Sequence, residues 1–391
     1  MKRLFSKMDK SLLFVMIAFL IFGLVMVLSA SSMESYMRYG YNPYHYFYRQ
    51  AIFMGIGLVL YFIILRIPIK IYKPLSYVFM FGIIACLAGL TVYGHVSNNA
   101  QSWFKVGLFS IQPSEFAKII SIIFLANCYE NNKENLNNYK VLIKPIIPVV
   151  IIFGLVLIQP DLGTALIIGF ITFFIFFSLP MSKKMFRKFQ FIFLCFVSLI
   201  VLVFVLTGGR FLKDYQRERF NFKDPCLRYQ DESGYQLCNS LIAFKNGGLV
   251  GQGIGKSTQK YLYLPESYTD FIFPIIVEEW GVWVGIFIII LYLFIIYRLY
   301  RIARRAVTLQ GSIIAYGVCC YVFLHVSINL MGVMGIGPLT GVPLPFLSYG
   351  GSYIINLMAA LAHSERVCIE SENIKKKRNK KKKINNNQNG N

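Results

Sequence analysis

Charged side chains are scarce in this sequence, and acidic ones are the scarcest. Charged residues make up 15% of the 391 positions, and Asp and Glu together number 18. A soluble domain carries roughly 25% charge. Hydrophobic residues reach 56%, and the mean hydropathy is +0.56. This composition excludes an ordinary soluble domain and indicates that lipid is the main solvent of the chain.

Several other features are absent. The eight cysteines show no metal-ligand spacing, and no segment of roughly 20 to 50 residues repeats. The glycine series at Gly251, Gly253 and Gly255 follows no predicted strand, so it does not indicate a nucleotide site. The sequence thus predicts no cofactor, and it leaves open whether a divalent cation takes part.

Long apolar stretches are what the sequence has instead. A transmembrane helix needs about 20 mostly apolar residues to cross about 30 Å of hydrocarbon. The fourth stretch is short and carries Glu115 and Lys118, so we expect a tilted or broken helix there. We predict an all-α polytopic membrane protein with one transmembrane domain over residues 1–366. Its ten expected spans are 11–30, 50–66, 74–93, 113–128, 143–159, 161–180, 190–207, 271–297, 312–335 and 350–366.

Lysine and arginine residues predict how the chain is oriented. Cytoplasmic loops of membrane proteins carry an excess of these residues, and here the excess falls at the N-terminus and in every second connection. Both termini are therefore predicted to lie in the cytoplasm, and the loop 208–270 on the extracytoplasmic side. The basic inner residues are Lys2, Arg3, Lys7, Lys10, Arg66, Lys70, Lys73, Lys133, Lys140, Lys144, Lys183, Lys184, Arg187, Lys188, Arg298, Arg301, Arg304 and Arg305.

Part of the formal net charge of +22 is concentrated near the C-terminus. Eight positive charges lie in Lys375–Lys383, and an Asn-rich end follows them. We predict that residues 367–391 form a disordered cytoplasmic tail that is attracted to anionic lipid. No nucleic-acid recognition fold accompanies the tail, so no nucleic-acid partner is expected.

The predicted outer loop 208–270 differs in composition from the spans on either side. It is polar and rich in glycine and titratable groups, and an irregular backbone of this kind cannot face lipid. We expect short helices and turns over the outer mouth of the bundle. Cys226 and Cys238 both lie in this loop and could pair in an oxidising compartment. The sequence leaves that pairing open.

Asp270 stands where the outer loop meets an apolar run that begins at Phe271. One role for it is structural, because Thr269 or Asp270 would cap the helix that follows. The other role is chemical, because a carboxylate at a helix start near the lipid headgroups could act as a general base. The residues alone do not decide between the two.

Other acidic residues fall at or near the outer membrane boundary. Glu115 and Lys118 are three positions apart on one helix face and are expected to pair. Asp161 is expected to cap the helix after it. An ionisable group at membrane depth costs at least a few kcal/mol unless it is paired or hydrated. At least one of Glu278 and Glu279 should therefore face a hydrated cavity or a basic partner.

The segment 335–351 is the other irregular stretch on the predicted outer side. Its three prolines and several glycines forbid a continuous helix, so it must fold back within the protein. It would form either the floor of a substrate cavity or a rigid plug.

Basic residues of the outer loop could bind phosphate oxygens, Arg in bidentate fashion. They could equally form a solvated surface. These residues are Arg210, Lys213, Arg217, Arg219, Lys256 and Lys260.

Several ordered blocks together resemble the SEDS family, the membrane glycosyltransferases of bacterial shape, elongation, division and sporulation. They extend over nearly the whole chain. The blocks are Gln112-Pro113-Ser114-Glu115-x-x-Lys118; Gln159-Pro160-Asp161-Leu162-Gly163-Thr164; Gly234-Tyr235-Gln236 with Ser240-Leu241-Ile242-Ala243; Gln259-Lys260 through Leu264-Pro265-Glu266; Thr269-Asp270-Phe271-Ile272-Phe273 with Glu278-Glu279; and Pro338-x-Thr340-Gly341 through Ser348-Tyr349-Gly350-Gly351.

The resemblance implies a peptidoglycan glycosyltransferase. Its substrate would be lipid II, the undecaprenyl-pyrophosphate-linked disaccharide peptide, and it would act on the outer face of the bacterial cytoplasmic membrane. Asp270 matches the family's catalytic residue and would be the general base. The resemblance also implies a substrate site in which Arg217, Arg219 and Lys260 hold the pyrophosphate. The other expected substrate-site residues are Glu115, Lys118, Gln259, Glu266, Ser348 and Tyr349.

The block that contains Ser257, Gln259 and Lys260 is closer to the division and sporulation branch of the family than to the elongation branch. We therefore expect a role in cell division, with sporulation or elongation as alternatives. The resemblance implies a class B penicillin-binding protein transpeptidase as partner, together with other division proteins. A lipid II flippase is the alternative of another class, and a noncatalytic scaffold for division partners is a third.

Two departures from the family pattern stand out. Gln101-Ser102-Trp103 lacks the basic pair that commonly precedes this Trp, and Tyr353 replaces the second serine after Gly350-Gly351. Neither affects Asp270, but both weaken the transfer of finer binding roles.

Overall fold

The computed structural model describes residues 5–93, 95–97, 100–106, 109–207 and 224–388. The all-α prediction is confirmed, and each predicted span falls on helical structure. The long helices are α2 (Lys10–Arg38), α3 (His45–Ile64), α4 (Tyr72–Tyr93), α5 (Pro113–Asn131), α7 (Ile146–Ile158), α8 (Leu162–Ser178), α9 (Lys183–Thr207), α13 (Val282–Arg305), α14 (Leu309–Val333) and α15 (Gly351–Gln388). The short ones are η1 (Ile69–Ile71), η2 (Lys133–Asn135), α6 (Tyr139–Ile143), η3 (Pro225–Arg228), α11 (Glu232–Gly247) and α12 (Ile272–Trp280).

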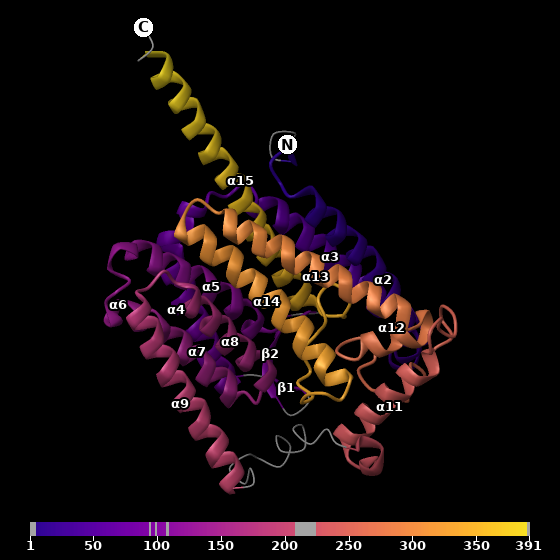
Figure 1. Cartoon of the computed structure of the whole chain (residues 1–391). Coiled ribbons are helices and arrows are strands. Elements are labelled where there is room, and N and C mark those ends of the chain that lie inside the picture. The colour runs from indigo at the N-terminus through magenta and orange to yellow at the C-terminus, as the bar shows by residue number, and fades with distance from the viewer. Residues whose placement is uncertain (1–4, 94, 98–99, 107–108, 208–223, 389–391) are drawn as a thin grey trace.

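Within the described residues, six helical segments are long and apolar enough to cross a membrane by length and composition. They are α2, α3, η1 with α4, α6 with α7, α13 and α14, and α8 is a shorter apolar helix. Figure 1 shows both chain ends at one end of the bundle and α11 and strand β1 at the other. A chain that crosses a membrane an even number of times has both of its ends on the same side.

Helix α14 lies at the centre of the bundle. It contacts α5, α8, α13 and α15. Of the residues in its most apolar stretch, 72% are buried inside the protein, compared with 28% in α13. Polar side chains on α14 therefore face protein rather than lipid.

The span predicted at 271–297 is wrong as a single helix, because it is divided into α12 and α13 at Gly281. Gly281 has φ +86°, and a Cβ added there would lie 2.4 Å from the carbonyl oxygen of Leu249. The broken helix ends obtain partners from the outer loop, since Val282 N donates to Gly248 O at 3.0 Å and Gln252 N donates to Glu278 O at 2.9 Å. Backbone groups at membrane depth need such partners.

The glycines of the outer loop serve this close approach. A Cβ at Gly247 would lie 2.2 Å from Val277 O, and a Cβ at Gly251 would lie 2.4 Å from Glu279 O. These two glycines thus bring the loop backbone against the broken helix.

A small antiparallel sheet precedes α5 and was not predicted from the sequence. Its strands are β1 (His95–Ser97), β2 (Ala100–Val106) and β3 (Phe109–Ile111), in that order. β1 and β3 have three residues each and are too short to show an alternating apolar pattern. Helix α5, which we expected to be tilted or broken, is one helix with Pro113 in its first turn, where proline is tolerated.

Helix α15 continues beyond residue 366, where we placed the end of the membrane domain. Val367 and Ile369 are buried, and Glu370 Oε1 accepts a hydrogen bond from Ile69 N at 2.9 Å. The helix extends to Gln388, so the described part of the segment that we predicted to be disordered is helical. The hydrogen bond between Ile69 and Glu370 ties this part of α15 to η1.

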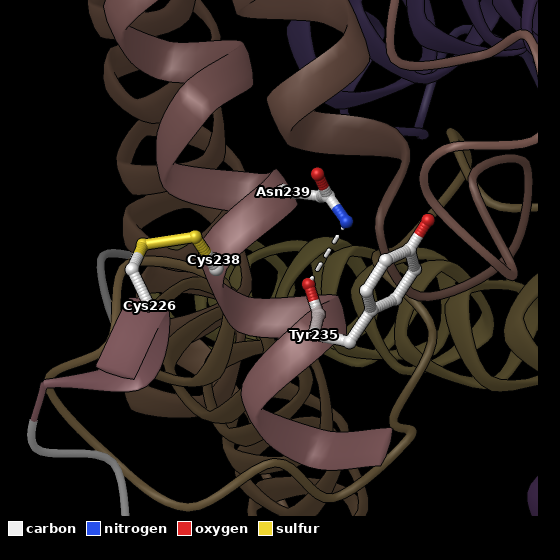
Figure 2. Close-up of a disulfide and its surroundings, with 4 residues drawn as sticks. All are labelled: Cys226, Tyr235, Cys238 and Asn239. Atoms are coloured by element: carbon white, nitrogen blue, oxygen red, sulfur yellow. Dashed lines mark hydrogen bonds between the residues drawn. A yellow bond between two sulfur atoms is a disulfide. The ribbon is translucent and has the colours of Figure 1, made fainter. Parts of the chain in front are cut away.

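The two cysteines of the outer loop form a disulfide. It joins Cys226 in η3 to Cys238 in α11, with their Cα atoms 4.9 Å apart. Figure 2 shows the bond next to the first turns of α11, where Asn239 donates a hydrogen bond to Tyr235 O. Gly234 permits the close contact, because a Cβ there would lie 2.1 Å from Arg228 O. The disulfide thus ties η3 to α11.

This bond predicts how the two thiols react. In intact, unreduced cells, a membrane-impermeant maleimide should label neither Cys226 nor Cys238. After a reductant is added, Cys226 should become reactive, because it is exposed, whereas Cys238 is 3% exposed. A Val250→Cys variant provides the positive control, because Val250 is 82% exposed in the same loop. Labelling of both native cysteines without reductant would contradict the disulfide.

Candidate active site

Asp270 lines a small pocket where three segments meet. The segments are the end of the outer loop, the last turns of α14 and the irregular stretch after α14. The pocket is lined by Asp270, Phe271, Ile328, Asn329, Gly332, Val333, Leu339, Thr340, Gly341 and Val342.

Thr269 connects two carboxylates at this place. Its Oγ1 lies 2.9 Å from Asp270 Oδ1 and 2.9 Å from Glu266 Oε2. The backbone of Glu266 is in the left-handed region, with φ +55°, and its carbonyl accepts from Phe271 N at 3.3 Å. Thr269 Oγ1 also lies 3.0 Å from Glu266 O. A hydroxyl donates one hydrogen, so Thr269 serves one of these three acceptors at a time. The turn thus brings the side chains of Glu266 and Asp270 to the same hydroxyl.

The structure does not show the capping role that the sequence allows for Asp270. Helix α12 has Phe271 as its N-cap, and no side-chain hydrogen bond caps it there. The hydrogen bond to the Asp270 carboxylate described above comes from Thr269. Asp270 is partly exposed, and a base must be reachable by its substrate.

Asn329 was not among the predicted site residues. It lies on α14, and its Nδ2 donates to Asp270 O at 2.7 Å and to Val342 O at 2.8 Å. The sequence does contain a signal for it, because a lone amide within an apolar span must find partners when buried. Its partners are distant in sequence, so the signal does not say which groups they are.

Gly341 lines the same pocket as the Asp270 side chain. It has φ +65°, and the only heavy atom within 4 Å of an added Cβ would be Asp270 Oδ2, at 3.8 Å. The irregular segment also approaches α8 closely, because a Cβ at Gly163 of that helix would lie 2.7 Å from Thr340 O. The irregular segment therefore forms one wall of the pocket beside the carboxylate.

A Gly341→Ala substitution should lower turnover by about tenfold or more, because the left-handed backbone is strained by roughly 1–2 kcal/mol when the residue has a Cβ. Relief of that strain would shift the segment, and a displacement of about 1 Å near reacting groups can cost about 100-fold. Gly40→Ala is the control, since Gly40 has φ +59°, is exposed and has no atom within 4 Å of its Cβ position. Equal rates of product formation in the two variants would contradict the role of Gly341.

Glu115 and Lys118 form the predicted pair, and they do so deep in the bundle. Lys118 Nζ lies 2.7 Å from Glu115 Oε1 and 3.1 Å from His325 Nε2. His325 Nδ1 lies 3.2 Å from Pro343 O. A carbonyl only accepts, so Nδ1 carries the hydrogen and Nε2 accepts from Lys118. The pair thus supports the wall segment through His325 and does not line the Asp270 pocket.

Glu278 holds the turn that contains Gln259. Its carboxylate accepts from Thr258 Oγ1 at 2.8 Å, from Gln259 N at 3.2 Å and from Asn246 Nδ2 at 2.9 Å. These bonds fasten the turn to α12. Gln259 is buried and does not line the Asp270 pocket.

Lys260 is also committed to a buried contact. Its Nζ lies 2.8 Å from Glu279 Oε1 and 3.1 Å from Ser29 Oγ. The side chains of Lys260 and Glu279 are 4% and 0% exposed. Glu279 thus has the basic partner predicted for it, and the ammonium of Lys260 faces the protein interior.

Ser348 and Tyr349 lie in the irregular segment near its end. Ser348 is fully buried, and its Oγ accepts from Leu344 N at 2.7 Å. Tyr349 N donates to Tyr268 O at 2.8 Å, and the Tyr349 ring lies 5.7 Å from that of Tyr268 and 5.1 Å from that of Tyr46. Burial raises the pKa of Tyr268 and of Tyr349, so both phenols are protonated at neutral pH. These contacts fix the segment against the turn before Asp270.

Asp161 caps α8, as predicted, because its Oδ1 accepts from Thr164 N at 3.0 Å. Arg217 and Arg219 lie outside the described residues. In the part of the chain that the structure describes, no group of three or more His, Cys, Asp or Glu side chains could hold a metal ion.

Known proteins are similar to this chain over nearly its whole length. A family model for FtsW, RodA and SpoVE, described as "Cell cycle protein", matches residues 9–372. The chain is 37% identical to a Bacillus subtilis protein named "Probable peptidoglycan glycosyltransferase FtsW", over 96% of this chain and 95% of that protein. It is 35% identical to the stage V sporulation protein E of the same organism, over 91% and 96% of the two chains.

Solved structures agree with this relationship. A chain of a peptidoglycan synthase complex matches with a TM-score of 0.75 and 26% identity, over 93% of this chain and 98% of that chain. The Thermus thermophilus rod shape-determining protein RodA matches with a TM-score of 0.65 and 26% identity, over 92% and 96%. The resemblance seen in the sequence blocks is therefore confirmed, and this chain is a membrane protein that belongs to the FtsW, RodA and SpoVE family.

Proposed function

We propose that this protein is a peptidoglycan glycosyltransferase that polymerises lipid II, with Asp270 as general base. Its family membership supports the reaction class. The observation that carries the assignment of the base is the placement of the Asp270 carboxylate, which lines a pocket at the start of an apolar helix. A lipid-linked substrate would present its reacting group at that level.

The proposed reaction needs one proton acceptor. Asp270 takes the proton of the acceptor sugar 4-hydroxyl as that oxygen bonds to the anomeric carbon of the donor. The bond from the anomeric carbon to the pyrophosphate oxygen breaks, and undecaprenyl pyrophosphate leaves with inversion. The leaving group already carries its charge, so it needs to be held rather than protonated. We assign that task to Arg217 and Arg219.

The Thr269 hydroxyl orients the base in this scheme. Its Oγ1 lies 2.9 Å from Asp270 Oδ1, and we assign the proton to Oδ2, the oxygen on the side of Gly341. Glu266 lies on the other side of the Thr269 hydroxyl and would bind the acceptor sugar as a second carboxylate. A short network with fixed geometry is what pre-organises a catalytic group.

We further propose that the active site faces the extracytoplasmic side and that both termini are cytoplasmic. The position of both chain ends at one end of the bundle supports this orientation, as does the excess of basic residues in the connections at that end. Similarity to proteins named FtsW favours a role in cell division. The structural neighbour comes from a complex that coordinates polymerization and crosslinking, which supports a class B penicillin-binding protein as partner.

The test uses purified protein, reconstituted in vesicles with its transpeptidase partner and given fluorescent lipid II. A ladder of glycan strands is the expected result. Movement of labelled lipid across the bilayer without any ladder would instead establish the flippase alternative. The absence of both activities would leave the scaffold alternative.

A further inference from the structure

The carbonyl of Asp270 stands just before α12 begins. The first carbonyl that can accept a hydrogen bond within this helix is that of its N-cap, Phe271. The helix therefore supplies no donor to Asp270 O. The donor comes from another helix, because Asn329 Nδ2 lies 2.7 Å from Asp270 O.

The same amide group holds a second segment. Asn329 Nδ2 also donates to Val342 O at 2.8 Å, next to Gly341, which lines the same pocket as the Asp270 carboxylate. Both partners are carbonyls, which only accept, so the amide nitrogen must face them and its orientation is fixed. One side chain therefore joins the backbone at Asp270 to the backbone of the wall opposite.

This orientation leaves the amide oxygen in an unfavourable place. Asn329 is 2% exposed, and its Oδ1 has no hydrogen-bond partner among the described residues. A buried acceptor without a partner destabilises the folded state. A leucine of similar size would avoid that loss, but it would leave the carbonyls of Asp270 and Val342 without this donor. What the asparagine contributes is therefore its hold on these two backbone segments. The residue also lines the Asp270 pocket.

We propose that Asn329 is a positioning residue for the transfer reaction, because its two amide hydrogens hold Asp270 and the Gly341-Val342 wall at a fixed separation. The inference rests on the proposed function of Asp270. A general base must stand within hydrogen-bond reach of the proton it accepts. Loss of the link would displace the base relative to the bound sugar without removing the carboxylate.

The test compares Asn329→Leu with Asn127→Leu. Asn127 is also fully buried, and its Nδ2 donates to a carbonyl, Tyr72 O, at 3.0 Å, but it lies on α5 among residues of the inner end. In Asn329→Leu, kcat for lipid II polymerisation should fall by about 100-fold, while KM stays within about twofold of the wild type because substrate contacts are kept. Asn127→Leu should keep its kcat, even though its melting temperature should fall at least as far.

A second readout does not depend on catalysis. Amide hydrogen exchange should become faster in residues 268–273 and 339–344 of Asn329→Leu and should stay unchanged there in Asn127→Leu. If Asn329→Leu does not fold, Asn329→Ser takes its place, since a hydroxyl can serve one of the two carbonyls, and it should lose part of the kcat.

Two results would overturn the proposal. One is an Asn329→Leu protein with the kcat of the wild type. The other is a kcat that falls in both leucine variants in proportion to the loss of folded protein, with unchanged exchange near Asp270. If the wild-type protein forms no glycan strands, the proposed function fails instead, and the exchange data still report whether Asn329 holds the two segments.

Discussion

Replacing Lys260 by methionine should cost about 3–5 kcal/mol of stability, because it leaves the carboxylate of Glu279 buried without a compensating charge. The ammonium of Lys260 lies 2.8 Å from Glu279 Oε1, and both side chains are almost fully buried. A Lys260→Met protein should therefore show a clearly lower melting temperature in detergent. Lys256→Met is the matched control, since Lys256 belongs to the same turn and is exposed, and its melting temperature should not change.

A double variant separates folding from substrate binding at this position. Lys260→Met combined with Glu279→Gln leaves no buried charge, so most of the lost stability should return. Its KM for lipid II should equal that of the wild type, because the buried ammonium contacts Glu279 and Ser29. A stable double variant with a strongly raised KM would contradict this and return Lys260 to the substrate site, where the sequence blocks placed it.

Replacing Asp270 by asparagine should lower the rate of lipid II polymerisation by about 10²- to 10⁴-fold, the contribution expected of a general base. Asparagine has nearly the same size and can still accept the hydrogen bond from Thr269, so the fold should be kept. The loss should therefore appear in kcat, with melting temperature unchanged. Initial rates of fluorescent glycan formation measure it.

Two further variants control this result. Asp270→Glu keeps the carboxylate but moves it by one methylene, so its rate should lie between those of the wild type and Asp270→Asn. Asp231→Asn removes an exposed carboxylate from the outer part and should leave the rate unchanged. An equal loss in Asp231→Asn would mean that the effect comes from charge on the outer surface.

Local features of this protein could be predicted from the sequence. The positions of the apolar helices follow from the apolar stretches of the sequence, and the Asp161 cap and the Glu115–Lys118 pair join residues only three positions apart. Such contacts depend on helix geometry alone. The family blocks identified Asp270 as the residue to examine.

Long-range contacts could not be predicted in the same way. The apolar run after Phe271 reads as one span, but Gly281 breaks it because the backbone at Leu249 approaches closely. Nothing near Lys260 in the sequence shows that its ammonium would be buried against Ser29. Asn329 likewise could be identified as a buried amide, whereas its partners became known only from the packing of α14 against two loops.

The most direct test of the account is a side-by-side measurement of glycan-strand formation by wild-type protein and Asp270→Asn. Both are purified with the same transpeptidase partner, whose own crosslinking site is inactivated, and both receive the same fluorescent lipid II. We expect a ladder of glycan strands from the wild type and almost none from Asp270→Asn, with equal melting temperatures of the two proteins. Ladders of equal rate and length from the two proteins would contradict the assignment of Asp270 as the base.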